Sequence, residues 1–171
     1  MTEEKVQLHR GLREVYIDRS KSSFIDGNIG KLLYRGYNID ELAVHSNFEE
    51  TAYLVMYGKL PTQAQLDEFD AKLKAARLIP DEIVDIIKLI RHSHPMDVLR
   101  TAISALSAYD PDTEDNSTEA TLRKGLRLTA QAPTIVATHA RVRDGKDPIA
   151  PDSNLNQAAN FLNMLFGELP E

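Results

Sequence analysis

The chain has 171 residues, of which 42% are hydrophobic and 27% are charged, and its formal net charge is -6. This length suits one domain with its own core or a large part of a bigger domain, and the composition excludes a disordered tail. The acidic balance and the scattered lysines and arginines argue against a nucleic-acid partner. The absence of cysteine excludes a disulfide scaffold and a thiolate metal site.

The start of the chain carries no sign of secretion or membrane insertion. Residues 1–7 are polar and charged, and no later apolar run reaches membrane-spanning length. We therefore expect a cytoplasmic protein without a membrane partner. Residues 1–10 are interpreted as an N-terminal tail and residues 11–171 as one helical unit.

The segment 11–37 is the only part that favours β structure. Val15-Tyr16-Ile17 alternates with polar neighbours, Asp26-Gly27-Asn28 is a turn signal, and Lys31 to Tyr34 is a second short extended run. This pattern predicts a small hairpin or two short strands. The rest of the chain has the apolar period of helices, so the expected fold class is mainly α with a short β segment near the N-terminus.

Four residues mark the starts of helices in the first half. Asn38, Asn47 and Thr62 can cap helices with their side chains, and Pro80 suits a helix start because its missing N–H costs nothing there. Gly58 is the expected end of the second helix.

The second half predicts three more helices around one loop. The segment 96–109 has small and apolar residues around much of its circumference, so we expect it to be buried on more than one side. Residues 110–117 form the clearest loop. Thr118 is the expected cap of a long helix reaching Val142, and a last helix is expected over 154–166.

The histidines give weak evidence for chemistry. His92 and His94 stand two residues apart just before Pro95, so they face different ways and lack a full ligand set. A capping or core role is favoured over a metal site. We predict no catalytic residue, no metal and no cofactor, and we leave the substrate-binding residues unassigned.

Short motifs, taken in order, resemble those of bacterial and archaeal citrate synthases. Five of them are Tyr34 to Leu42, Tyr57-Gly58-Lys59-Leu60-Pro61, His94-Pro95-Met96, Tyr109-Asp110-Pro111-Asp112 and Ala159-Asn160-Phe161-Leu162. The resemblance extends over the whole chain from Gly11. The related 2-methylcitrate synthases share these motifs, so the acyl donor stays open between acetyl-CoA and propionyl-CoA.

The resemblance implies an activity that this chain does not complete. Citrate synthases condense oxaloacetate with acetyl-CoA to citrate and CoA, using segments of the form H-x-D-H-E-x-N-A-S-T, G-P-L-H-G-G-A-N and G-F-G-H-R, none of which occurs here. We therefore expect the amino-terminal portion of the large helical domain, inactive alone, with oxaloacetate and acyl-CoA as ligands of the full-length enzyme only. The alternatives are a 2-methylcitrate synthase fragment or a naturally short, non-catalytic partner of a full-length synthase.

The resemblance also implies a homo-oligomer in which helices of two subunits form a sandwich. The candidate dimer-interface residues are Leu99, Ala102, Ile103, Leu106, Gly125, Leu126, Thr129 and Pro133. Arg35 and Arg100 lie in matched motifs, where we expect buried ion pairs. The last helix is expected to expose Phe161, Leu162, Leu165 and Phe166.

Overall fold

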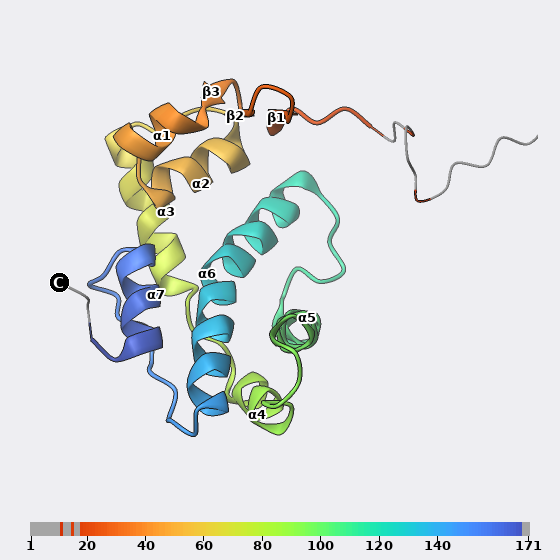
Figure 1. Ribbon diagram of the computed structural model, residues 1–171, viewed down its shortest axis with the longest axis vertical. Coiled ribbons are helices and arrows are strands. Elements are labelled where there is room, and N and C mark those ends of the chain that lie inside the picture. The colour runs from red at the N-terminus through yellow and green to blue at the C-terminus, as the bar shows by residue number, and fades with distance from the viewer. Residues whose placement is uncertain (1–10, 12–14, 16–17, 169–171) are drawn as a thin grey trace, which may run out of the picture.

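The computed structural model describes residues 11, 15 and 18–168, and in this part the fold is mainly α, as predicted (Figure 1). A small sheet, β1 to β3, leads into the helices α1 to α7 and one short 3₁₀ turn. Their bounds are β1 Ser23–Asp26, β2 Lys31–Tyr34, β3 Tyr37–Asn38, α1 Ile39–His45, α2 Phe48–Tyr57, α3 Gln63–Ala75, α4 Asp81–Leu89, α5 Pro95–Leu106, the 3₁₀ turn Ser107–Tyr109, α6 Thr118–Arg143 and α7 Gln157–Phe166. Within the described residues no helix combines the length and apolar character needed to span a bilayer.

The predicted hairpin is present, with a third strand that the sequence did not reveal. β1 pairs antiparallel with β2, and Asp26 accepts a hydrogen bond from the Asn28 amide in the turn at 3.0 Å. β3 pairs with the far end of β2 but has only two residues, too few to show an alternating pattern. The extended run expected at Val15-Tyr16-Ile17 lies mostly outside the described residues: Tyr16 and Ile17 are not described, and Val15 is not part of a strand.

The predicted caps of the first helices are confirmed. Asn38, Asn47 and Thr62 each accept a backbone hydrogen bond at the start of α1, α2 and α3. At α2 the Glu50 carboxylate also accepts from the Asn47 amide at 3.1 Å, which completes a capping box. Gly58 ends α2 with a φ of 83°, a conformation that only glycine adopts at no steric cost.

The caps of the last two helices differ from the prediction. Ser117, one residue before Thr118, caps α6 by accepting from the Ala120 amide at 3.2 Å. α7 begins three residues after Asn154, and Asn156 is its cap. Serine and asparagine cap as well as threonine, so a polar run such as Asn-Ser-Thr leaves the boundary open by a residue or more.

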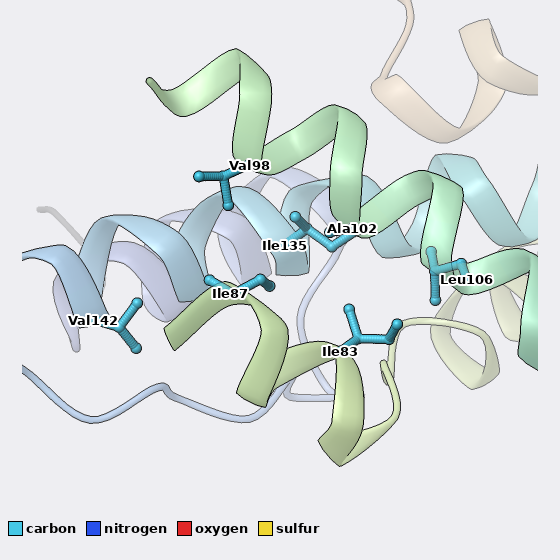
Figure 2. Close-up of a cluster of buried hydrophobic side chains, with 7 residues drawn as sticks. All are labelled: Ile83, Ile87, Val98, Ala102, Leu106, Ile135 and Val142. Atoms are coloured by element: carbon cyan, nitrogen blue, oxygen red, sulfur yellow. The ribbon is translucent and has the colours of Figure 1, made fainter. Parts of the chain in front are cut away.

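One apolar cluster holds α4, α5 and α6 together (Figure 2). Its buried members are Ile83, Ile87, Val98, Ala102, Leu106, Ile135 and Val142. α5 contributes a single stripe to it, whereas Met96, Thr101 and Ser104 are exposed. Within this chain, the expectation that the helix is buried on more than one side was therefore wrong. Small residues around a helix do not by themselves indicate packing on every face.

A second cluster joins α2 and α3 to the other side of α6. It comprises Tyr53, Phe69, Leu73, Leu126 and Ala130, with the rings of Tyr53 and Phe69 edge to face at a centroid distance of 5.4 Å. α6 thus separates two apolar clusters, and its long axis organises the domain (Figure 1).

A buried arginine links α7 to this framework. Arg77, which follows α3, donates from Nε to Gln157 Oε1 at 2.8 Å and from Nη1 to the carbonyl oxygens of Asp152 and Leu155 at 2.9 Å each. The backbone N–H of Gln157 in turn donates to the buried carboxylate of Glu49 at 2.7 Å. Burial lowers the pKa of the Arg77 guanidinium, although an arginine stays charged in proteins.

Replacing Arg77 by Met should lower the free energy of unfolding by about 3 kcal/mol, because the acceptors on three residues would stay buried without a donor. Urea unfolding followed by circular dichroism measures this change. The control is Arg100→Met, whose side chain is 78% exposed in a pair with Asp97 and should change stability by less than about 0.5 kcal/mol. Equal effects of the two variants would contradict the role given to Arg77.

Candidate functional site

Two of the histidines have structural roles in the described residues. His94 is the N-cap of α5, and its Nδ1 accepts from the Met96 amide at 3.2 Å, so the predicted capping role is confirmed. His139 is buried in α6, where Nε2 lies 3.0 Å from the carbonyl oxygen of Arg91. Both imidazoles join backbone segments rather than facing a cavity with a carboxylate partner.

The remaining histidines that the structure describes belong to no cluster of metal ligands. His92 is exposed, and His45 lines a small surface pocket with Glu41 and Glu50. His9 lies outside the described residues. Among those that the structure describes, no three His, Asp or Glu side chains gather closely enough to hold a metal ion.

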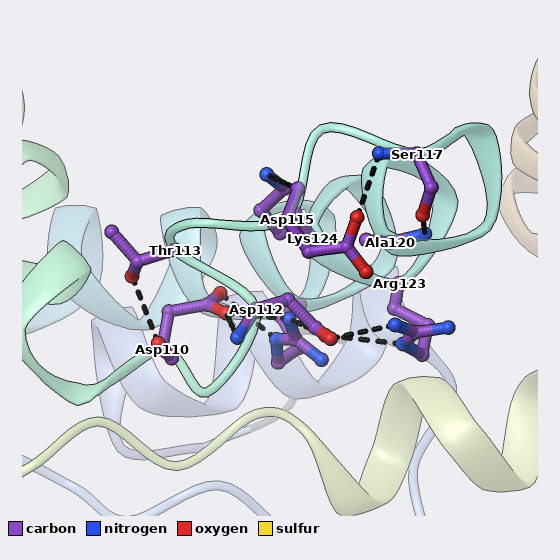
Figure 3. A network of polar contacts seen from close by, with 9 residues as sticks. Asp110, Asp112, Thr113, Asp115, Ser117, Ala120, Arg123 and Lys124 are labelled. Atoms are coloured by element: carbon purple, nitrogen blue, oxygen red, sulfur yellow. Dashed lines mark hydrogen bonds and ion pairs between the residues drawn. The ribbon is translucent and has the colours of Figure 1, made fainter.

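A charged cluster, here called the Asp–Arg cluster, joins Asp110 and Asp112 of the loop before α6 to Arg123 and Arg127 of α6 (Figure 3). Arg127 donates to both oxygens of Asp110 at 3.0 and 2.7 Å and to Asp112 at 2.6 Å. Arg123 donates to both oxygens of Asp112 at 3.1 and 2.6 Å. The signal for this cluster in the sequence is a pair of aspartates, separated by one residue, that is followed by two arginines on one helix face.

These contacts change the acidity of both aspartates. Hydrogen bonds from Arg123 and then Arg127 hold the pKa of Asp112 far below its ordinary value. Burial acts to raise the pKa of Asp110, but hydrogen bonds from Arg127 and from the Asp112 amide outweigh it and lower that pKa. The cluster is therefore ionised and internally neutralised near neutral pH, which suits a structural role better than acid–base chemistry.

An open groove lies between α5 and α6, next to the Asp–Arg cluster. Its volume is about 490 Å³, and most of its surface is apolar. Its lining, here called the α5–α6 groove, consists of Leu78, Ile79, Pro80, Ile103, Leu106, Ser107, Tyr109, Asp110, Thr113, Lys124, Arg127, Leu128 and Gln131. Two of these residues, Ile103 and Leu106, are among the predicted interface residues.

Comparison with known proteins agrees with this helical framework. A sequence model described as "Citrate synthase, C-terminal domain" matches residues 11–171. The citrate synthase of Haloferax volcanii is 46% identical over 169 residues, which cover 96% of this chain and 45% of that protein. This chain belongs to the citrate synthase family.

Other members of the citrate synthase family are similarly close. The 2-methylcitrate synthase of Mycobacterium tuberculosis is 42% identical over 170 residues, or 99% of this chain and 43% of that one. The crystal structure of citrate synthase from Pyrobaculum aerophilum superposes with a TM-score of 0.89 at 38% identity, covering 94% of this chain and 42% of the other. The chain thus spans less than half the length of the relatives it matches.

The eight interface residues predicted from this family do not form one open face. Ala102 and Leu106 are buried against α4 and α6, and Leu126 is buried in the cluster with α2 and α3. A side chain at Gly125 would meet Met56 of α2 at 3.6 Å. Of the eight, the partly exposed residues are Leu99, Ile103, Gly125, Thr129 and Pro133, and the interface itself stays a prediction.

The two arginines of the family motifs do not form the expected buried ion pairs. Arg35 donates from Nε and Nη2 to the Val55 carbonyl oxygen at 3.0 and 2.7 Å, where it satisfies the carboxyl end of α2. Arg100 pairs with Asp97 on the exposed side of α5. The expectation was wrong for Arg35 because a free backbone carbonyl, which the sequence does not reveal, is an alternative acceptor for a guanidinium. It was wrong for Arg100 because its ion pair is exposed rather than buried.

Acid should destabilise the chain through the Asp–Arg cluster. The pKa of Asp112 is lower in the folded chain than in the unfolded chain. The stabilisation that the Asp112 carboxylate gives is therefore fully present above the unfolded pKa of about 3.9 and is lost as the pH falls below that value. Wild type should therefore lose more stability between about pH 6 and pH 3 than Asp112→Asn does. Urea unfolding of both proteins at the two pH values tests this. A dependence unchanged in Asp112→Asn would contradict the argument.

Proposed function

We propose that this chain supplies the amino-terminal helical scaffold of the large domain of a citrate synthase. In its complete form that enzyme would condense oxaloacetate with acetyl-CoA to give citrate and CoA. Family membership over residues 11–171 and the similarity to the Haloferax volcanii enzyme support the proposal. The single observation that carries it is the shared fold, a TM-score of 0.89 to a solved citrate synthase.

A second candidate is the scaffold of a 2-methylcitrate synthase that takes propionyl-CoA. The 42% identity to the Mycobacterium tuberculosis 2-methylcitrate synthase supports this reading almost as well as the identity to citrate synthases supports the first. The two donors differ by one methylene, a difference that a pocket discriminates through its own lining.

We further propose that the chain alone is inactive. The condensation needs a base to remove a proton from the acyl thioester and donors to stabilise the enolate oxygen. Two of the described histidines hold backbone groups, and the Asp–Arg cluster is neutralised internally. A naturally short, non-catalytic partner of a full-length synthase would share these features.

We propose that the complete enzyme is a cytoplasmic homo-oligomer. It would bind acyl-CoA and oxaloacetate and use no separate cofactor. The partly exposed residues of α5 and α6 named above support a helical contact between subunits. Phe166, at the end of α7, is 62% exposed, as predicted, whereas Phe161, Leu162 and Leu165 are half-buried. A subunit contact that covers the exposed apolar residues of α5, α6 and α7 would remove apolar surface from water.

Thiol release from acetyl-CoA or propionyl-CoA in the presence of oxaloacetate tests the proposed function. The purified chain should give no turnover above background with either donor, because His94 and His139 hold backbone groups and the Asp–Arg cluster is neutralised internally. A measurable rate that falls in His92→Ala or His94→Ala would contradict the scaffold role and place chemistry within this chain.

A further inference from the structure

The chain contains two Asp–Gly pairs, Asp26–Gly27 and Asp144–Gly145. In such a pair the glycine nitrogen can attack the carboxyl carbon of the aspartate, because glycine has no side chain to hinder the approach. A bond forms between the nitrogen and Cγ, and a bond between Cγ and one carboxyl oxygen breaks. That oxygen leaves as water with the amide proton and the carboxyl proton, and a succinimide ring remains in the main chain.

Water then opens the succinimide at either of its two carbonyl carbons. When water adds at the former main-chain carbonyl carbon, the bond from this carbon to the glycine nitrogen breaks. The chain then continues through Cγ, and the residue has become isoaspartate. One water is lost and one is gained, so the mass is unchanged and the reaction needs no co-reactant besides solvent.

The turn between β1 and β2 presents Asp26 and Gly27 for this reaction. Asp26 Oδ1 accepts from the backbone N–H of Asn28 at 3.0 Å, which folds the carboxyl group back along the main chain toward the Gly27 nitrogen. Gly27 is exposed, and none of the residues that the structure describes accepts a hydrogen bond from its N–H. The attacking nitrogen is therefore unprotected and lies beside its target.

The second Asp–Gly pair is held by the end of a helix. Asp144 is the C-cap of α6, and the backbone N–H of Gly145 donates to the Val142 carbonyl oxygen at 3.2 Å. The next N–H, of Lys146, donates to the Arg141 carbonyl oxygen at 2.9 Å. Attack by the Gly145 nitrogen therefore requires that the end of α6 first opens.

A third aspartate separates the effect of the turn from that of the glycine. Asp152 Oδ1 accepts from the backbone N–H of Asn154 at 2.8 Å, the same kind of contact that Asp26 makes. The residue after Asp152 is Ser153, whose Cβ hinders the attack, and the Asp152 carbonyl oxygen is held by Arg77. Of these three aspartates, Asp26 alone combines the folded-back carboxyl group with a following glycine whose nitrogen is accessible.

We propose that Asp26 is a site of spontaneous isoaspartate formation in the folded chain. The modification lengthens the main chain of the β1–β2 turn by one carbon atom. It also removes the side-chain acceptor of the Asn28 N–H, so it loosens the hairpin with which the sheet begins. This modification goes beyond the proposed scaffold function and does not depend on it.

The test is peptide mapping after incubation of the purified chain at neutral pH below its unfolding midpoint. Mass spectrometry distinguishes isoaspartyl peptides from aspartyl peptides by retention at equal mass, and endoproteinase Asp-N does not cleave before isoaspartate. Isoaspartate at Asp26 should exceed that at Asp144 by at least about fivefold, because attack by Gly145 requires the loss of a backbone hydrogen bond. Asp152 should likewise stay below Asp26. In urea, the two Asp–Gly pairs should react within about twofold of each other, since unfolding removes their structural difference.

Gly27→Ala tests the role of the glycine while keeping the carboxylate. A Cβ at Gly27 would meet nothing within 4 Å, so the circular dichroism spectrum should match that of wild type. Isoaspartate at Asp26 should fall by at least about fivefold, because the added methyl group hinders the attack. Gly125→Ala is the matched control and should leave the rate at Asp26 unchanged, because Gly125 lies within α6.

Three results would overturn the proposal. The first is equal isoaspartate at Asp26 and Asp144 in the folded chain. The second is no isoaspartate at Asp26 in the folded chain, whatever happens in urea. The third is a rate at Asp26 that Gly27→Ala leaves at the wild-type value.

Discussion

The buried guanidinium of Arg77 is the interaction on which the carboxyl-terminal part of the domain depends. It lies after α3, yet its donors reach two carbonyl groups in the segment before α7 and the side chain of Gln157 in the first turn of that helix. The carbonyl oxygen of Arg77 also accepts from the Thr134 hydroxyl of α6 at 2.9 Å. One residue therefore connects three helices distant in sequence, and its Nη2 has no partner among the described residues.

α6 provides the surface against which these contacts are made. Pro133 has no N–H to donate to the Thr129 carbonyl oxygen, which would leave that group free in the middle of the helix. The Gln157 side chain lies 3.5 Å from this oxygen and 3.3 Å from that of Ala130, so the proline coincides with the point where α7 approaches. The Gln157 side chain of α7 thus offers a donor to the carbonyl oxygen that Pro133 leaves without its usual N–H partner.

The sequence was sufficient to predict those features of the fold whose deciding interaction is local. Caps such as Asn38 and Asn47, the stop at Gly58 and the hairpin turn are each fixed by residues a few positions apart, and all were predictable. Arg77 could not be predicted, because its acceptors lie about eighty positions away and two of them are backbone oxygens. The α5–α6 groove also escaped prediction, since it exists only where three separate segments meet.

The charged contacts and the histidine cap of the described residues are structural, and the groove beside them is an apolar surface. The ionised Asp–Arg cluster and the His94 cap shape the helices, while the apolar residues of the groove stay partly exposed. These features fit a chain with less than half the length of its relatives in the citrate synthase family.

Amide hydrogen exchange, followed by mass spectrometry, tests most directly whether Arg77 joins α7 to the rest of the domain. Amides in α7 should be protected to within about tenfold of those in α6, because the two helices then open together. Rapid exchange throughout α7, with α6 still protected, would contradict the account.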